Sequence, residues 1–407
     1  MALRIAYVLI FKRDDAPDGD AIYYAGQAQF IADGRWFTFD APVAEAADHP
    51  PLTSLALSVV ALGFPASVLA QRIGVAVVGA VVVVVIGVLG REIGGDRAGL
   101  IAAVIAAVYP NLWMNDALTM SETFVALLVA ILLVVVYRTP SPLSTRRLAG
   151  LGALVGLLAL TRSETALLFV LVVVPIAVGA TYERWARRLG LMAIAAVAAA
   201  AIVAPWTIYN VTRFEKPVLL SSNDGLTLLG ANCDDVYYGG DTALWDLGCI
   251  LGLPVAGDQS EVSEAYRELA FDYIANHKRR LPVVMAARVG RVWSLYGPAR
   301  MVEYNTGEGR ETWASWLGLG AYYLLAPAAV VGAVVLRRRG VALAPLLATA
   351  ALVTISAALF YGLVRFRVPA EVAIVVLAAV ALDAGRPGLR SGAVVSPALP
   401  SGEHVRP

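Results

Sequence analysis

Charged residues are scarce in this chain. Asp, Glu, Lys and Arg make up 15% of its 407 residues, whereas a typical soluble domain contains about 25%. Hydrophobic residues account for 59%, and the mean hydropathy is +0.70. The composition therefore predicts a protein that is solvated mainly by lipid. The formal net charge of +1 offers no electrostatic basis for binding nucleic acid, so no nucleic-acid partner is expected.

Histidine is also rare, and this excludes several kinds of site. The three histidines are His49, His277 and His404, from which no HExxH or multi-histidine zinc motif can be built. The GxxxxGK[ST] phosphate-binding loop is missing too, because the stretch GGDRAG does not fit that pattern. Zinc hydrolases of the HExxH type and P-loop nucleotide hydrolases are therefore not expected.

Long apolar runs are what the chain has instead. A membrane-spanning helix needs about 20 consecutive apolar residues. Nine segments are interpreted as full spans, at 71–90, 98–114, 121–137, 148–163, 165–181, 189–209, 314–336, 341–363 and 368–384. The predicted fold class is therefore an all-α polytopic membrane protein.

Arginine-bearing connections set the predicted orientation. Five short connections carry arginine: REIGGDR (91–97), RTPSPLSTRR (138–147), YERWARR (182–188), RRRG (337–340) and GRPGLR (385–390). Counting the spans in order puts all five on one side of the membrane. Lysine and arginine collect in cytoplasmic loops, so that side is predicted to be the inner side of a plasma membrane, together with a C-terminal cytoplasmic tail at 385–407.

Two apolar segments are not counted as full spans. Residues 51–70 are interrupted at Gly63 and Pro65 and are predicted to form an interfacial helix, because a tenth span would put the arginines outside. Residues 1–11 are too short to cross and no cleavage site follows them, so they are interpreted as the remnant of a first transmembrane span. The remaining predicted parts are an extracytoplasmic catalytic loop at 12–70, a transmembrane bundle at 71–209, an extracytoplasmic loop domain at 210–313 and a second bundle at 314–384.

The 210–313 loop is expected to have structure of its own. The stretch SEVSEAYRELAFDYIANHKRRL has apolar residues at helical spacing. The stretch that follows, PVVMAARVGRVWSLYG, sets Arg288 and Arg291 among apolar residues and is typical of a helix lying on a membrane surface. The chain's only cysteines, Cys233 and Cys249, both fall in this loop. An extracytoplasmic compartment permits disulfides, so we expect them to pair; two free buried thiols are the alternative.

Ionisable residues of both signs gather at the outer ends of the predicted spans. The acids are Asp14, Asp15, Asp18, Asp20, Asp48, Asp116, Glu122 and Glu164, and the bases are His49, Arg162, Arg213, Arg365 and Arg367. Charged groups near a bilayer are costly and often mark a substrate path. Carboxylates can deprotonate a hydroxyl, and arginines can bind a phosphate through two hydrogen bonds. The polarity of helix ends explains any single one of these residues, but their gathering on one face indicates a substrate site.

The order of several motifs along the chain resembles a known family. The motifs are GD..YY, HPPL, YPNLWMNDALTMSE, LTRSE, PWTIYN…SSNDG and RFRVPAE. They are similar to those of bacterial GT-C membrane glycosyltransferases, more closely of the glycosyltransferase family 39 or ArnT-like group, relatives of protein O-mannosyltransferases and aminoarabinose transferases. The resemblance covers nearly the whole chain and implies a GT-C type helical bundle with outer-face loops and interfacial helices. It also implies transfer of a sugar from a polyprenyl-phosphate donor to an acceptor hydroxyl on the extracytoplasmic face. The acceptor, whether cell-envelope glycan, lipid or protein, is left open.

The resemblance implies roles for individual residues. Asp20 matches the catalytic aspartate of the first outer loop, although Ala21 stands where relatives often carry a second acid. Asp48 and His49 fall where relatives have an acid and a base before the proline pair. In some relatives that acid contributes to a metal site, so a divalent metal at Asp48 and His49 is left open. Glu122 matches an acid at the start of a span and is the second catalytic candidate. The resemblance assigns no role to Arg162, Arg365 and Arg367. The candidates for substrate binding are Tyr23, Tyr24, Asp48, His49, Arg162, Glu164, Arg365 and Arg367.

Asp20 is expected to act as the general base. A prenyl phosphate leaves as an anion, so the reaction needs a base for the acceptor hydroxyl and cations for the phosphate, and no strong acid. Asp20 also precedes AIYYAGQAQFIAD, where the N-cap of a helix belongs, and capping alone would explain it. Capping lowers the pKa of a carboxylate, whereas burial against Tyr23, Tyr24 and a lipid-bound donor would raise it toward the operating pH.

Two other functions compete with a glycosyltransferase. A transporter or flippase for a lipid-linked or small polar substrate is the first alternative. Transporters tend to place charged residues and broken helices near the bilayer midplane, but here the centres of the spans contain Ala, Val and Leu. A membrane scaffold without catalysis would not require acids and arginines on one face. The transferase is therefore preferred.

Overall fold

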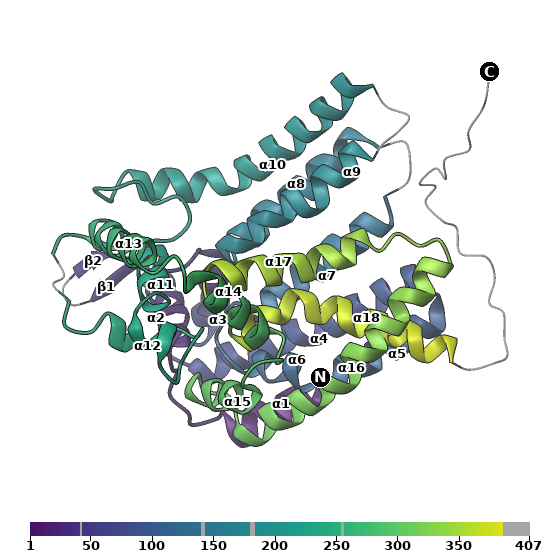
Figure 1. Cartoon of the computed structure of the whole chain (residues 1–407), viewed down its shortest axis with the longest axis horizontal. Helices are drawn as coiled ribbons and strands as arrows, with labels where there is room; N and C mark the ends of the chain where they lie inside the picture. Colours follow the sequence, from purple (N-terminus) through teal and green to yellow (C-terminus); the bar gives the residue numbers. More distant parts are fainter. Residues whose placement is uncertain (41–42, 140–142, 180–183, 254–255, 386–407) are drawn as a thin grey trace.

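The computed structural model describes residues 1–40, 43–139, 143–179, 184–253 and 256–385, and Figure 1 shows that their regular secondary structure is almost entirely helical. Strands within them are limited to an antiparallel hairpin of β1 (Thr38–Asp40) and β2 (Val43–Glu45). The predicted all-α fold is confirmed. The predicted cytoplasmic tail lies outside the described residues, except for Gly385.

The apolar helices form one bundle. Its helices are α4 (Val68–Gly94), α5 (Asp96–Val108), α6 (Pro110–Trp113), α7 (Glu122–Tyr137), α8 (Thr145–Ala159), α9 (Val174–Val178), α10 (Trp185–Val211), α16 (Thr312–Arg338), α17 (Ala344–Leu359) and α18 (Val368–Ala384). Short turns join some of them: η1 (Asn115–Ala117), η2 (Ser163–Leu167), η3 (Phe169–Val173) and η5 (Val364–Arg367). Every residue of α18 from Val368 to Val380 is buried. This helix packs against α4, α5, α7, α16 and α17 and so forms the centre of the bundle.

The number of full-length spans is smaller than predicted. All nine predicted segments coincide with helical structure where they are described. Among the described residues, however, only α4, α10 and α16 are both long and apolar enough to cross a membrane, and α5 with segment 110–117 makes a fourth if this pair, bent by 58°, is one span. Helices α7 and α17 have 16 residues each. At 1.5 Å per residue they reach about 24 Å, less than the roughly 30 Å of a hydrocarbon core.

The remaining segments gather at one end of the bundle, which we call the loop end (Figure 1). Its elements are α1 (Ala2–Phe11), α2 (Asp20–Ala32), β1, β2, α3 (Leu52–Gly63), α11 (Asp224–Gly230), α12 (Asp234–Tyr238), η4 (Leu247–Cys249), α13 (Gln259–Asn276), α14 (Leu281–Val292) and α15 (Pro298–Gly307). Two segments far apart in sequence meet here. The Ser222 amide donates to the Ala47 carbonyl at 2.8 Å, and the Ala47 amide donates to the Gln259 side chain at 2.9 Å.

The predicted break within residues 51–70 is confirmed. α3 ends at Gly63, and α4 begins at Val68. The side chain of Ser67 caps α4 by accepting a hydrogen bond from the Ala70 amide at 3.2 Å. A short helix that stops before the first long one is what the interfacial interpretation requires of this segment.

The first helix is docked on the bundle by an ion pair. Arg4 of α1 is buried, and its Nε lies 2.5 Å from Oδ2 of Asp116. Asp116 also accepts a hydrogen bond from the Thr123 hydroxyl at 2.7 Å. Asp116, one of the acids predicted at the outer face, therefore has a structural role, because its carboxylate holds α1 against the bundle.

Both helices predicted in the 210–313 region are present, as α13 and α14, but the arginines of α14 do not lie where a membrane-surface helix would place them. α13 is the expected helix, and a capping box of Asp258 and Glu261 starts it. α14 does not present its arginines to a membrane surface, because Arg288 and Arg291 are both buried. Arg288 donates to the Ala231 carbonyl, and Arg291 donates to the Thr242 carbonyl at 2.6 Å. These hydrogen bonds attach α14 to the chain segments at Ala231 and Thr242.

Cys233 and Cys249 are joined by a disulfide, with their Cα atoms 6.0 Å apart. The loop that they close contains α12, whose Val236 and Tyr237 are fully buried against Val284 of α14. The loop is therefore packed on the loop end and not suspended above it.

We expect the native protein to lose about 3 kcal/mol of unfolding free energy when both cysteines are replaced by serine, the usual worth of closing a loop of about 15 residues. Unfolding of wild type and Cys233→Ser/Cys249→Ser in the same detergent measures this loss. The intact mass before reduction should be lower by two hydrogens than after it. Two thiols that react with an alkylating reagent in the native oxidised protein would contradict the pairing.

Candidate active site

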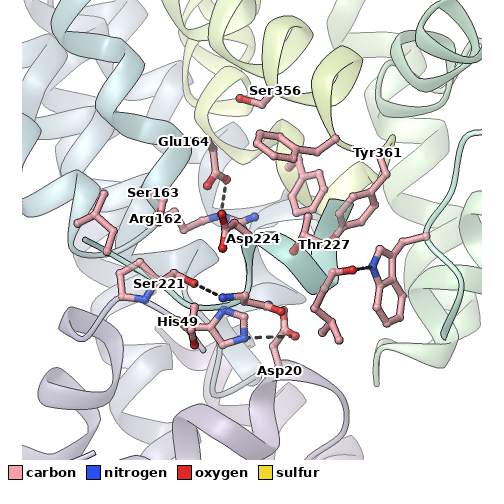
Figure 2. Close-up of a pocket in the computed structure, with 18 of the residues that line it drawn as sticks. Asp20, His49, Arg162, Ser163, Glu164, Ser221, Asp224, Thr227, Ser356 and Tyr361 are labelled. Atoms are coloured by element: carbon pink, nitrogen blue, oxygen red, sulfur yellow. Dashed lines mark hydrogen bonds and ion pairs between the residues drawn. The ribbon is translucent and has the colours of Figure 1, made fainter. Parts of the chain in front are cut away.

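A cavity of about 920 Å³ lies at the loop end of the bundle. Its walls come from the start of α2, residues 49–50, the η2–η3 segment, residues 216–227 and residues 356–366. Figure 2 shows side chains from these segments gathered around a common space. The predicted site residues that line the cavity are Asp20, Tyr24, His49, Arg162, Glu164 and Arg365. Most of the predicted site is thus brought together from distant parts of the sequence.

Asp20 lies on the cavity wall as the first residue of α2 (Figure 2). The N-cap position is occupied by Gly19, and no side chain caps this helix. The Asp20 carboxylate instead has one oxygen 2.7 Å from Nη1 of Arg365 and the other 3.5 Å from Nε2 of His49. The interpretation of Asp20 as an N-cap is therefore wrong, and its side chain is directed at Arg365 and His49.

The charge state of Asp20 is set mainly by Arg365. Burial by itself raises the pKa of this carboxyl, but Arg365 and His49 outweigh burial and hold the pKa well below its usual range. Arg365 is effective because its side chain is only 7% exposed, and a buried charge is weakly screened by solvent. The expectation that burial raises the Asp20 pKa toward the operating pH is therefore wrong. Asp20 is ionised throughout the neutral range.

His49 is held between two tyrosines. The Tyr24 ring is stacked on the imidazole at a centroid distance of 4.9 Å, and the Tyr23 ring meets it edge-on at 5.1 Å. Tyr24 and His49 both line the cavity, whereas Tyr23 is not part of its wall. Tyr23 therefore supports the orientation of His49 and is not placed to bind a substrate in the cavity.

Glu122 lies behind the wall and anchors its arginines. Oε1 of Glu122 is 3.2 Å from Nη1 of Arg162 and 3.9 Å from Nη1 of Arg365, and the Glu122 side chain is 1% exposed. Arg162 also has its Nε 2.6 Å from Oε1 of Glu164, which does line the cavity. Phe366 packs beside both guanidinium groups, at 4.7 Å from that of Arg162. Glu122 is thus placed to hold the two cations in position, not to reach a substrate directly.

Glu308 is a cavity residue that the sequence analysis missed. Its Oε1 lies 3.2 Å from Nε of Arg365, and its Oε2 lies 2.8 Å from Nη1 of Arg310. The acid is flanked by Gly307 and Gly309, a pattern that marks the turn between α15 and α16. A charged residue between two glycines and next to a predicted span is the sequence feature that could have identified Glu308 as a site residue. Arg365 thus lies between two carboxylates of the cavity, Asp20 and Glu308.

Arg367 does not belong to the cavity, contrary to the prediction. Its side chain is completely buried, and its Nε lies 2.6 Å from Oε1 of Glu371, one helical turn away. Nη1 donates to the Val292 carbonyl at 3.1 Å and to the Ser294 hydroxyl at 3.0 Å. Arg367 therefore joins α18 to the end of α14. Its side chain leaves η5 in a different direction from that of Arg365 because its partners lie inside the bundle.

Asp48 is adjacent to the cavity but is not part of its wall. Its Oδ1 accepts a hydrogen bond from Nε2 of Gln259 at 2.7 Å. Burial raises the pKa of Asp48, and His49 and Gln259 offset this only partly. Within the described parts of the chain, no group of three or more His, Cys, Asp or Glu side chains is arranged to hold a metal ion. The residues present therefore do not fit the metal site left open for Asp48 and His49.

One side of the cavity is apolar and open to the surroundings of the bundle. Leu167 and Val170 of the η2–η3 segment, Leu219, and Leu359 at the end of α17 line it. Three of these side chains are well exposed: Val170 is 58%, Leu219 is 62% and Leu359 is 53% exposed. This apolar wall begins a few residues after Arg162, so an apolar chain lying along it would end at a guanidinium group.

Comparisons with known proteins agree with this architecture. Residues 48–209, less than half of the chain, match the family of dolichyl-phosphate-mannose-protein mannosyltransferases. The match covers α3 to α10 and so includes His49, Glu122 and Arg162, but not Asp20 or Arg365. No curated protein matches the chain.

Solved structures share the fold at low sequence identity. The chain is 16% identical to the oligosaccharyltransferase AglB of Archaeoglobus fulgidus, solved with an inhibitory peptide and a dolichol-phosphate, with a TM-score of 0.53 over 94% of this chain and 49% of that one. The same enzyme solved with zinc and sulfate gives 15% identity, 94% and 48% coverage and a TM-score of 0.52. ArnT of Cupriavidus metallidurans, bound to undecaprenyl phosphate, is 17% identical over 94% of this chain and 77% of that one, with a TM-score of 0.43.

The likeness to AglB concerns the fold, since the chain spans about half the length of that enzyme. The TM-score to ArnT is too low to carry an argument. Residues 48–209 are thus similar to this mannosyltransferase family, and the chain shares the fold of AglB, in line with the resemblance seen in its sequence.

Proposed function

We propose that this protein is an integral-membrane glycosyltransferase. It transfers a sugar from a polyprenyl-phosphate carrier to the hydroxyl of an acceptor on the extracytoplasmic face of the plasma membrane. The observation that carries the proposal is the cavity itself, in which an outward-open apolar wall meets a charged floor of Asp20, His49, Arg162 and Arg365. An apolar chain with an anionic head group fits such a cavity, and AglB has been solved with a dolichol-phosphate.

The carrier lies along Leu167 and Val170 in this proposal, with its phosphate beside Arg162. Arginine binds phosphate through two parallel hydrogen bonds. Glu164 pairs with Arg162 through Nε, so an incoming phosphate competes with Glu164 for this guanidinium. Arg162 remains in place during the exchange because Glu122 holds it from behind.

The transfer is a substitution at C1 of the donor sugar. The acceptor hydroxyl oxygen forms a bond to C1 while the bond from C1 to the phosphate oxygen breaks, and the carrier phosphate leaves with the electron pair. The hydroxyl proton passes to Asp20. A carboxylate with a lowered pKa is a weak base, so it takes the proton late, once bond formation has made the hydroxyl acidic. Arg162 and Arg365 stabilise the departing phosphate charge.

Two measurements test the function. Deletion of the gene, followed by mass spectrometry of the cell-envelope glycans, lipids and glycoproteins, should reveal one structure that lacks a sugar. The purified protein in liposomes should convert a polyprenyl-phosphate sugar to free polyprenyl phosphate when that acceptor is added. Movement of the intact donor across the liposome membrane without conversion would support the transporter alternative instead.

The proposed orientation predicts which surface positions are accessible from outside. Asp272 on α13 and Arg339 after α16 are both exposed, and the two native cysteines are in a disulfide. In intact cells, a membrane-impermeant maleimide should label Asp272→Cys and should label Arg339→Cys only after permeabilisation. Labelling of Arg339→Cys in intact cells would show that the loop end faces the cytoplasm.

A further inference from the structure

A second wall of the cavity is polar and comes from the 210–313 region. It is formed by residues 221–227, by the first turns of α13 and by Trp245. The mechanism proposed above uses none of these groups. They lie beside the same space as Asp20, so a molecule held on this wall can present a hydroxyl to that carboxylate (Figure 2).

The polar wall is built from hydroxyl, amide and paired charged groups. Asp224 accepts a hydrogen bond from the Ser263 hydroxyl at 2.8 Å and pairs with Arg267. The Ser263 hydroxyl in turn accepts a hydrogen bond from the Gly225 amide at 3.0 Å. Thr227 lies one turn along α11, on the same wall. A hydroxyl can donate one hydrogen bond and accept two, so this wall offers donors and acceptors to a polyhydroxylated ligand.

Trp245 gives this wall an aromatic surface held in one orientation. Its indole Nε1 donates to the Leu226 carbonyl at 3.3 Å, and its own carbonyl accepts a hydrogen bond from the Tyr304 hydroxyl. The indole passes directly over Gly230, where an added Cβ would lie 2.2 Å from Nε1. Trp245 is also four residues before the disulfide-bonded Cys249. A fixed indole beside hydrogen-bonding groups suits a sugar ring, whose C–H face packs on aromatic surfaces while its hydroxyls bond to polar neighbours.

The charges that line the cavity argue against an anionic acceptor. The acids are Asp18, Asp20, Glu164, Asp224 and Glu308, and the cations are Arg162, Lys216, Arg267 and Arg365. The acids already exceed the cations by one, and the carrier phosphate adds further negative charge. A second anion in the same cavity would be repelled in a weakly screened environment, whereas a neutral molecule would not.

The wall does not favour an extended peptide either. Peptides that bind in extended form commonly pair their backbone with the edge of a sheet. The described strands, β1 and β2, contribute no residue to the cavity, whose described walls are helices and loops.

We propose that the acceptor is a neutral carbohydrate, one ring of which packs on Trp245 while its hydroxyls bond to the polar wall formed by residues 221–227 and 263. This inference rests on the proposed function, because it assigns the acceptor for the same cavity. The acceptor's attacking hydroxyl then lies between the wall and Asp20. Its oxygen bonds to C1 of the donor sugar, its proton goes to Asp20, and the carrier phosphate leaves.

Saturation-transfer NMR on the full chain in lipid nanodiscs tests the proposal. The probes are mannotriose and maltotriose as neutral trisaccharides, trigalacturonic acid as an anionic one, and a Ser/Thr-containing peptide. At least one neutral trisaccharide should give transfer signals, and Trp245→Ala should weaken its binding about tenfold or more. Gly230→Ala, which forces the indole aside, should act in the same direction, and Trp245→Phe should keep most of the binding. Trp316→Ala on α16, half exposed and outside the cavity lining, is the matched control and should change nothing.

Binding of undecaprenyl phosphate is measured on the same samples and should be equal in all variants. If the wild type does not bind undecaprenyl phosphate, this counts against the proposed function. The saccharide signals report on the acceptor independently. The thermal midpoint of each variant shows whether the chain is folded. Signals from the peptide or from trigalacturonic acid alone, no signal from either neutral trisaccharide, or unchanged saccharide binding in folded Trp245→Ala would each overturn the inference.

Discussion

Asp20→Asn is expected to lower turnover by about 10²-fold or more, the usual worth of a positioned general base, while the protein stays in the membrane at normal levels. The asparagine keeps the size of the side chain but cannot accept the proton of the acceptor hydroxyl. It also releases Arg365 and His49 from their shared carboxylate partner. Because no side chain caps α2, a loss of activity cannot be attributed to a lost helix cap. Initial rates with the donor and the acceptor identified by glycan profiling measure this change.

The lowered pKa of Asp20 determines how activity should depend on pH. The pKa of Asp20 lies well below its usual range, so the carboxylate and its pairing with Arg365 are present above the ordinary pKa of aspartate. Both are lost as the pH falls through the lowered pKa. If wild-type activity falls between about pH 7 and about pH 5, protonation of Asp20 should therefore not be the cause.

Asp18→Asn is the matched control for Asp20→Asn. Asp18 also lines the cavity, but its carboxylate accepts a hydrogen bond from the neighbouring Gly19 amide at 2.8 Å and precedes the rigid helix. Its replacement should leave turnover within about threefold of the wild type, since only a well-positioned base is worth 10²-fold. Near wild-type turnover in Asp20→Asn would show that Asp20 is not the base. Glu308 would then be the next candidate, because Glu122 does not reach the cavity wall.

Arg367→Met should cost about 3–5 kcal/mol of unfolding free energy, the usual loss when one partner of a buried ion pair is removed. Glu371 is 1% exposed and would be left without its cation, although the Tyr109 hydroxyl still donates to it at 2.7 Å. The bonds from Arg367 to Val292 and Ser294 would be lost as well. Reversible unfolding of the purified protein in mixed micelles measures the change.

The double variant Arg367→Met/Glu371→Leu separates the ion pair from general damage. Removal of both charges leaves no uncompensated carboxylate, so the double variant should be more stable than Arg367→Met alone. Arg365→Met, two residues earlier in the same turn, should instead reduce turnover more than stability, because it borders the cavity. A stability of Arg367→Met equal to that of the wild type would contradict the structural role of this pair.

Local sequence patterns predicted the helical framework well. Apolar runs and helical periodicity depend on neighbouring residues, so the positions of α4, α7, α10 and α13 followed from them. The break after Gly63 was also predicted from local signals. Span length was predicted less well, because several helices end before the apolar run does. After α8 and α17 the chain continues into η segments that line the cavity, and only the packed structure shows where this happens.

The sequence by itself determined that this is an all-α membrane protein with acids and arginines placed together at one end of a helical bundle. It did so because long apolar runs indicate membrane helices, and the ionisable residues stand near the ends of those runs. It could not distinguish Arg365, which meets Asp20 at the cavity, from Arg367, which is buried against Glu371. Only the tertiary structure decided this, and it also decided the low pKa of Asp20 and the presence of Glu308 in the cavity. The direction of a side chain and the charge of a carboxyl depend on partners that come from distant parts of the chain.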